Sequence, residues 1–178
     1  MKNKKKTYTL VAILLAIAAL GIGYAAISSI LTINGTAHIL ESDGATVTFK
    51  TGTASASGGE TGTTAAISDG TTATCTVYLK TLNQTATCTY TIKNTSTNTA
   101  LIASNLAATV YDSSDAVWSS SSDGYDYISV TPSIIATTLA NAAETTVTVQ
   151  VQLLKENTTG AEIQKTFTVK INGDTTQS

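Results

Sequence analysis

Apolar and polar residues alternate with a period of two along most of this chain after residue 30. Successive side chains of a strand point to opposite faces of its sheet, so this pattern predicts strands with one buried and one solvated face. Such one-sided burial is typical of antiparallel sheets. The predicted inward positions are Leu31, Ile33, Gly35, Ala37, Ile39, Val47, Phe49, Ala73, Cys75, Val77, Leu79, Ala86, Cys88, Tyr90, Ile92, Leu106, Ala108, Val110, Ile128, Val130, Val147, Val149, Val151, Leu153, Phe167, Val169 and Ile171.

The composition agrees with strands throughout. Threonine and valine, which favour pleated, half-buried surfaces, are abundant, and Pro132 is the only proline. No convincing amphipathic helix follows residue 25. We therefore predict an all-β fold: an antiparallel two-sheet sandwich of about eight strands, jelly-roll or Ig-like, formed as one domain by residues 26–178 and preceded by an N-terminal apolar signal helix.

The N-terminus has the layout of a secretory signal. A lysine cluster precedes an unbroken apolar run from Leu10 to Leu20, and Gly21, Gly23 and Ala25 follow as small residues. A basic region, a short apolar region and a small-x-small site are the three parts of a cleavable signal peptide. We predict a signal peptide over residues 1–25, with cleavage between Ala25 and Ala26. The lysines are Lys2, Lys4, Lys5 and Lys6.

A permanent membrane anchor is the alternative for this segment. Residues 10–31 form a mostly apolar stretch of 22 residues, long enough to span a bilayer. Both possibilities keep the lysines inside and place everything after Tyr24 outside. The predicted location is therefore extracellular or at the cell surface, with membrane contact only through the N-terminal segment before cleavage.

Cleavage would change the charge of the chain. Four of its ten lysines lie before residue 7, which leaves six lysines against twelve acidic residues, a formal charge of −6. A surface of this sign repels nucleic acid and anionic lipid, so neither is expected as a partner.

Two stretches lie outside the alternating pattern. Thr51–Thr72 is rich in glycine, serine, threonine and alanine, and its composition predicts a long flexible excursion. The second stretch contains four aspartates among serines, with Trp118 in its middle, and is expected to be a solvated loop. Its carboxylates are weak candidates for a Ca²⁺ site, although their spacing does not match an EF-hand. They are Asp112, Asp115, Asp123 and Asp126.

Cys75 and Cys88 are the only cysteines. If Leu79 pairs with Gln84 in an antiparallel hairpin, Cys75 lies directly opposite Cys88 on the same face, as a cross-strand disulfide requires. Export would supply the oxidising environment, and the closed loop would stabilise the domain by about 3 kcal/mol. Two buried free thiols are the alternative.

The sequence offers little for catalysis. His38 is the only histidine and falls on the polar face of the first predicted strand. A zinc hydrolase needs three protein ligands, and no His-Glu-x-x-His or Gly-x-Ser-x-Gly motif is present. No glycine-rich loop joins a strand to a helix, so nucleotide binding has no support. We expect no enzyme activity and no cofactor.

Three segments together carry a family resemblance. Residues 21–26 (GIGYAA) run into 31–37 (LTINGTA), residues 90–96 (YTIKNTS) precede Ala100, and 130–133 (VTPS) lead through 139–144 (LANAAE) into a valine-rich strand. Over most of its length the chain resembles the TasA and camelysin family of secreted biofilm fibre subunits, which have a SipW-type signal peptide. Ig-like surface domains share the second and third segments.

The resemblance implies a jelly-roll-like domain whose mature N-terminal strand leaves its own sheet and completes that of the next subunit. The candidate donor strand is residues 26–40, with Ile30, Leu31, Ile33, Ala37 and Ile39 filling the neighbour's groove. The metallopeptidase activity described for the family is not expected here, because the zinc motif is absent. We expect a homopolymeric matrix fibre subunit whose partners are other copies and other matrix proteins. The alternative is a membrane-anchored monomeric adhesin or binding module that uses the Trp118 loop.

Overall fold

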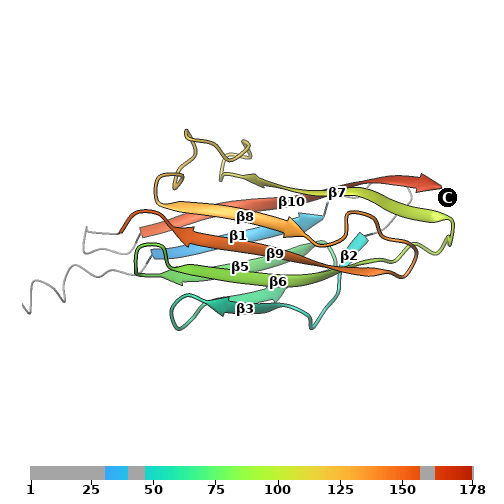
Figure 1. The fold of residues 1–178 in the computed structure, drawn as a ribbon, viewed down its shortest axis with the longest axis horizontal. Coiled ribbons are helices and arrows are strands. Elements are labelled where there is room, and N and C mark those ends of the chain that lie inside the picture. The colour runs from blue at the N-terminus through green and yellow to red at the C-terminus, as the bar shows by residue number, and fades with distance from the viewer. Residues whose placement is uncertain (1–30, 40–46, 157–162, 178) are drawn as a thin grey trace, which may run out of the picture.

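The protein is all-β in the computed structural model, which describes residues 31–39, 47–156 and 163–177. These residues contain ten strands and no helix (Figure 1). The strands are β1 (Leu31–Ile39), β2 (Val47–Phe49), β3 (Ser55–Gly58), β4 (Thr64–Ile67), β5 (Thr72–Leu79), β6 (Thr85–Asn94), β7 (Leu101–Tyr111), β8 (Ile128–Ile134), β9 (Glu144–Leu153) and β10 (Ile163–Gln177). No helix in this part of the chain is long and apolar enough to cross a membrane.

The strands form two sheets in a β-sandwich-like arrangement. The first sheet has the order β4-β5-β1-β10-β7, and the second has the order β2-β6-β9-β8, with β3 also paired to β6. Neighbouring strands are antiparallel except β1 and β10, which run parallel. The prediction of antiparallel sheets is therefore confirmed for all pairs but one. Because β5 and β10 run in opposite directions, β1 between them is antiparallel to β5 and parallel to β10.

The hydrophobic core lies between the two sheets and confirms the predicted faces. Among the predicted inward positions whose side chains are described, Ala108 and Val130 are half-buried and the others are buried. Tyr90 and Phe167 are the largest fully buried side chains, and the ring of Tyr90 meets that of Phe49 edge-on at 5.7 Å. The Tyr90 hydroxyl donates a hydrogen bond of 2.7 Å to the carbonyl oxygen of Thr74 in the opposite sheet. Burial raises the pKa of that hydroxyl.

The prediction of a flexible excursion over Thr51–Thr72 is wrong, because this segment forms β3 and β4. β3 pairs with β6 in the second sheet, and β4 pairs with β5 in the first. Two backbone bonds fix the turn between them: Gly59 N donates to Thr85 O, and Glu60 N donates to Tyr78 O. Gly58 and Gly59 both have a φ of +71°, a conformation that glycine adopts without strain. Gly58 and Gly59 therefore form the turn between two ordered strands and are not part of a flexible linker.

The Cys75–Cys88 disulfide is confirmed, with Cα atoms 6.0 Å apart, but the predicted hairpin is wrong. β5 and β6 belong to different sheets, so Leu79 and Gln84 do not begin an antiparallel ladder. The loop instead closes on the Gln84 side chain, whose Oε1 accepts bonds from the backbone N–H groups of Lys80 and Thr81. Both cysteines face inward as predicted, and the bond joins the two sheets.

The predicted signal peptide, the cleavage site between Ala25 and Ala26, and Ile30 of the candidate donor strand lie outside the described residues.

Candidate functional site

The first strand occupies the centre of the five-stranded sheet. Residues 31–38 of β1 pair with residues 79–72 of β5, and residues 31–39 pair with residues 163–171 of β10. Figure 1 shows β1 in blue between these two strands. Because β1 precedes the other strands of the described residues, its removal would leave two unpaired edges that face each other across a gap one strand wide. We call the edges of β5 and β10 that flank β1 the β1 slot.

Gly35 lies in the middle of β1, where it pairs with Cys75 on one side and Phe167 on the other. The Phe167 ring leans over Gly35 so closely that a Cβ added to the glycine would lie 2.1 Å from the ring's Cζ atom. Phe167 is only 1% exposed, so its ring has no open solvent to move into. The missing side chain of Gly35 is therefore part of how the slot is filled.

The solvated side of β1 is anchored by a polar contact. Asn34 is exposed, and its Oδ1 accepts a hydrogen bond of 3.2 Å from the Thr76 hydroxyl in β5. Of the predicted donor residues, Leu31, Ile33, Ala37 and Ile39 lie in β1 with the register above. Sequence reasoning missed the role of Gly35. The available signal was a glycine inside an alternating apolar run, which often marks a close approach of other groups to the backbone.

Asp112 organises the loop between β7 and β8. Its Oδ1 accepts bonds from the Ser114 hydroxyl and from the N–H groups of Ser114 and Ala116, and its Oδ2 accepts one from the Ser122 hydroxyl. The Ser114 hydroxyl, followed by the Ala116 N–H, favours the ionised form and lowers the pKa of Asp112 to about 2. This carboxylate therefore acts as a turn-forming acceptor.

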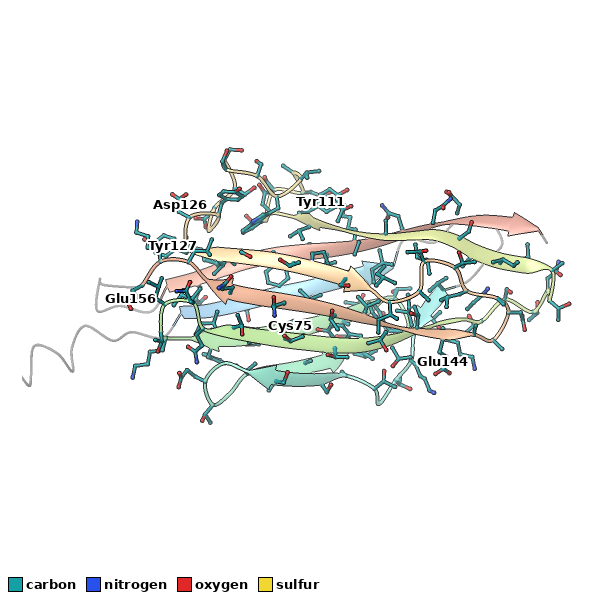
Figure 2. The ribbon with its side chains drawn as sticks, viewed as in Figure 1. Cys75, Tyr111, Asp126, Tyr127, Glu144 and Glu156 are labelled. Atoms are coloured by element: carbon teal, nitrogen blue, oxygen red, sulfur yellow. A yellow bond between two sulfur atoms is a disulfide. The ribbon has the colours of Figure 1, made fainter. Side chains whose placement is uncertain are left out.

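The structure does not bring the four loop carboxylates together. Asp115 forms an ion pair of 2.7 Å with Lys170, and Asp123 forms one of 2.6 Å with Lys165. Asp126 is exposed, and Figure 2 shows it at the far side of the loop from Tyr111. Within the described ranges, no three His, Cys, Asp or Glu side chains are grouped so that they could hold a metal ion. The calcium prediction gains no support from this loop.

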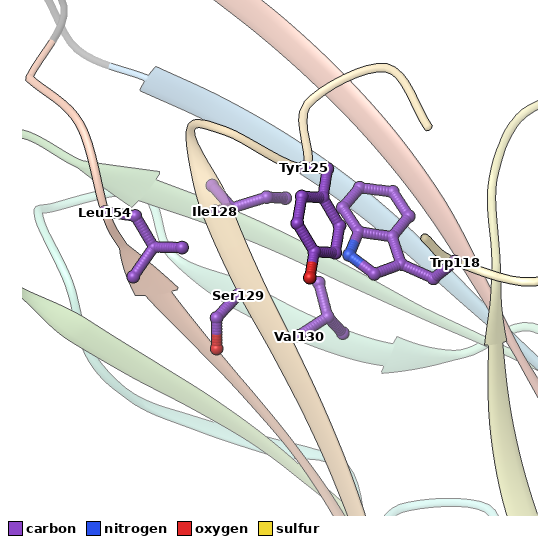
Figure 3. A pocket seen from close by; sticks show the side chains of 6 residues that line it. All are labelled: Trp118, Tyr125, Ile128, Ser129, Val130 and Leu154. Atoms are coloured by element: carbon purple, nitrogen blue, oxygen red, sulfur yellow. The ribbon is translucent and has the colours of Figure 1, made fainter. Parts of the chain in front are cut away.

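The same loop forms one wall of a shallow aromatic pocket. The rings of Trp118 and Tyr125 lie 6.3 Å apart and tilted by 40°. With Leu154 and residues of β8 they enclose about 260 Å³, and Figure 3 shows the two rings side by side above β8. The pocket is lined by Trp118, Tyr125, Ile128, Ser129, Val130 and Leu154. Trp118 thus lies where the alternative binding-module hypothesis requires a contact surface.

A scan against protein-family models and a search of curated proteins find no match for this chain. The fold defines an all-β protein of two mostly antiparallel sheets joined by a disulfide.

Proposed function

We propose that this protein is a secreted structural subunit that polymerises into extracellular fibres by exchanging β1 between copies. The observation that carries the proposal is the position of β1: the first of the described strands supplies the central strand of a sheet whose other four strands come later in the chain. If β1 of one copy enters the slot of another, the same backbone ladders form between chains as within one.

Non-reciprocal exchange of β1 builds an open chain of subunits. The donor strand and the slot are different surfaces, so each contact is head-to-tail, and such contacts generate filaments when the rotation does not close a ring. β1 contains no proline and no charged Asp, Glu, Lys or Arg that would block strand addition. Two-sided pairing would also leave the donor strand without an exposed edge inside the fibre.

Export rests on separate observations. The basic cluster, apolar run and small residues before Ala26 are the parts of a signal peptide. The Cys75–Cys88 disulfide fits an oxidising compartment. Together with the resemblance to TasA-like fibre subunits, these features support a jelly-roll or Ig-like matrix protein at the cell surface, with other copies as its main partners.

A membrane-anchored binding module is the second candidate. The observation that favours it is the pocket beside Trp118 and Tyr125, since aromatic side chains with polar tips are common at binding sites. In that case the apolar N-terminal segment stays attached, and β1 remains in its own sheet as the structure has it.

A cysteine mixing experiment separates the two candidates. Thr36 and Thr74 are paired across β1 and β5, so one exported chain with Thr36→Cys is mixed with another with Thr74→Cys under mild oxidation. Cross-strand neighbours are close enough for a disulfide. Exchange of β1 predicts disulfide-linked dimers of the two variants, seen on non-reducing gels, and fibres by electron microscopy.

The matched control uses Ser55→Cys and Thr89→Cys, which are paired across β3 and β6 within one chain. This mixture should give no disulfide-linked dimers on non-reducing gels, because β3 and β6 pair within one chain. If the β1 mixture also gives no disulfide-linked dimers while a chain with both Thr36→Cys and Thr74→Cys closes an internal bond, β1 serves its own sheet and the fibre proposal fails.

A further inference from the structure

The β1 slot is built to recognise one register of the strand that enters it. We propose that Gly35 and Phe167 select this register, so that the slot accepts an extended apolar-alternating segment only when a glycine stands opposite Phe167. The inference rests on the proposed function in one respect: the segment selected between chains is β1 of a second copy.

The alternating pattern of β1 excludes some displacements of the strand but not others. A slip by one residue turns the whole apolar set of β1 toward solvent, which excludes every odd displacement. A slip by two residues keeps the apolar face inward and is not excluded by the pattern. Another feature must therefore distinguish the observed register from those displaced by two.

Phe167 supplies that distinction. Its ring lies where a side chain at position 35 would be, with Cζ, Cε2 and Cε1 at 2.1, 2.4 and 2.9 Å from an added Cβ. Real Cβ atoms essentially never approach another heavy atom to less than 3.0 Å, so the ring or the strand would have to move. A slip by two places Ile33 or Ala37 opposite Phe167, and each of them has a Cβ.

The surroundings of the ring resist such movement. Phe167 is 1% exposed, and Val169 and Val77 are fully buried, so the ring can move only by displacing other core side chains. On the opposite side Gly35 pairs with Cys75, whose disulfide to Cys88 ties this wall of the slot to the second sheet. The disulfide therefore fixes the β5 wall of the slot beside the position that Gly35 occupies.

A double-mutant cycle on the full chain tests this contact. Gly35→Ala should lower the thermal midpoint of the unpolymerised protein by several degrees, and Phe167→Leu should cost less in the Gly35→Ala background than in the wild type. Gly70→Ala is the matched control, because a Cβ there meets only Thr48 at an ordinary 3.6 Å. Additive effects of Gly35→Ala and Phe167→Leu would overturn the proposed contact.

Assembly tests the same contact between chains. A synthetic peptide of residues 26–40 is added to exported wild-type chain during fibre growth, and fibre length is measured by electron microscopy. The wild-type peptide should occupy free slots and shorten fibres at least tenfold. A peptide with Gly35→Ala has no glycine to place opposite Phe167 in any register, and it should leave fibre length unchanged.

Equal shortening by both peptides would overturn register selection while leaving the fibre proposal intact. If the wild-type chain forms no fibres, the fibre proposal fails, and the stability cycle alone decides whether Gly35 and Phe167 set the register of β1 within its own sheet.

Discussion

Cys75 in β5 and Cys88 in β6 join the two sheets through the core, although only 13 positions separate them in the sequence. Cys75 pairs with Gly35 and Ala65 in the first sheet, and Cys88 pairs with Ala56 and Val149 in the second. The disulfide therefore connects the wall of the β1 slot to the opposite sheet. This position links the stability of the domain to the integrity of the slot.

Loss of the disulfide should destabilise the fold. Closing a loop of this length contributes about 3 kcal/mol, which corresponds to a fall in Tm of roughly 6–12 °C for a domain of about 150 residues. We expect this fall on reduction or with Cys75→Ala plus Cys88→Ala, measured by circular dichroism. Two labelled thiols per chain in unreduced, denatured protein would show that the bond is absent in solution.

Asn94 should be the most sensitive polar residue in the described part of the chain. Its side chain is fully buried, its Nδ2 donates to the carbonyl oxygens of Leu101 and Leu139, and its Oδ1 accepts from Ser96 N. Asn94→Ala removes these three bonds, although Leu139 O keeps its bond from Ala103 N, at a cost of about 2–4 kcal/mol in the free energy of unfolding. Urea denaturation measures it. The exposed Asn98→Ala, which removes one acceptor for Ala100 N, is the control and should cost under about 1 kcal/mol.

The loop between β7 and β8 should respond to acid through Asp112. Its folded pKa of about 2 lies below the ordinary 3.8, so the ionised carboxylate stabilises the folded loop above about pH 4. That contribution is lost as the pH falls through 2. Trp118 fluorescence should change over this window, and Asp112→Asn should abolish the change. A Trp118 transition at pH 2–4 that persists in Asp112→Asn would assign it to another group.

The inward faces of the strands were predictable because burial imposes a period of two on each strand. Val147, Val149 and Val151 are fully or almost fully buried, as their alternation predicts. The same periodicity says which face a strand buries but not which strand it pairs with. Cys75 and Cys88 illustrate this. Two inward-facing cysteines on consecutive strands can form a disulfide within one hairpin or between two facing sheets, and the structure has the second arrangement.

β3, β4 and the role of Gly35 were not predicted from the sequence, and the reasons are physical. β3 and β4 use small residues such as Ala56 and Ala65, which pack on the core without the bulky side chains that signal a strand. The role of Gly35 depends on Phe167, which lies 132 positions later in the chain. No local pattern could connect these two residues before the parallel pairing of β1 and β10 was known.

Ile33→Asp tests whether β1 serves a neighbour or its own sheet. Ile33 is paired with Val77, whose side chain is fully buried, so an inward carboxylate at position 33 would enter the core without a partner. This costs several kcal/mol, a large part of the stability of a typical domain. If β1 acts between chains, the exported variant should keep its β-sheet circular dichroism and form no fibres, because its slot is intact and only its donor strand is damaged. Asn34→Asp, one residue away on the solvated face, adds the same charge without burying it and should polymerise like the wild type. An Ile33→Asp chain that unfolds as a monomer would show that β1 belongs to its own core. One that polymerises normally would show that β1 takes no part in assembly.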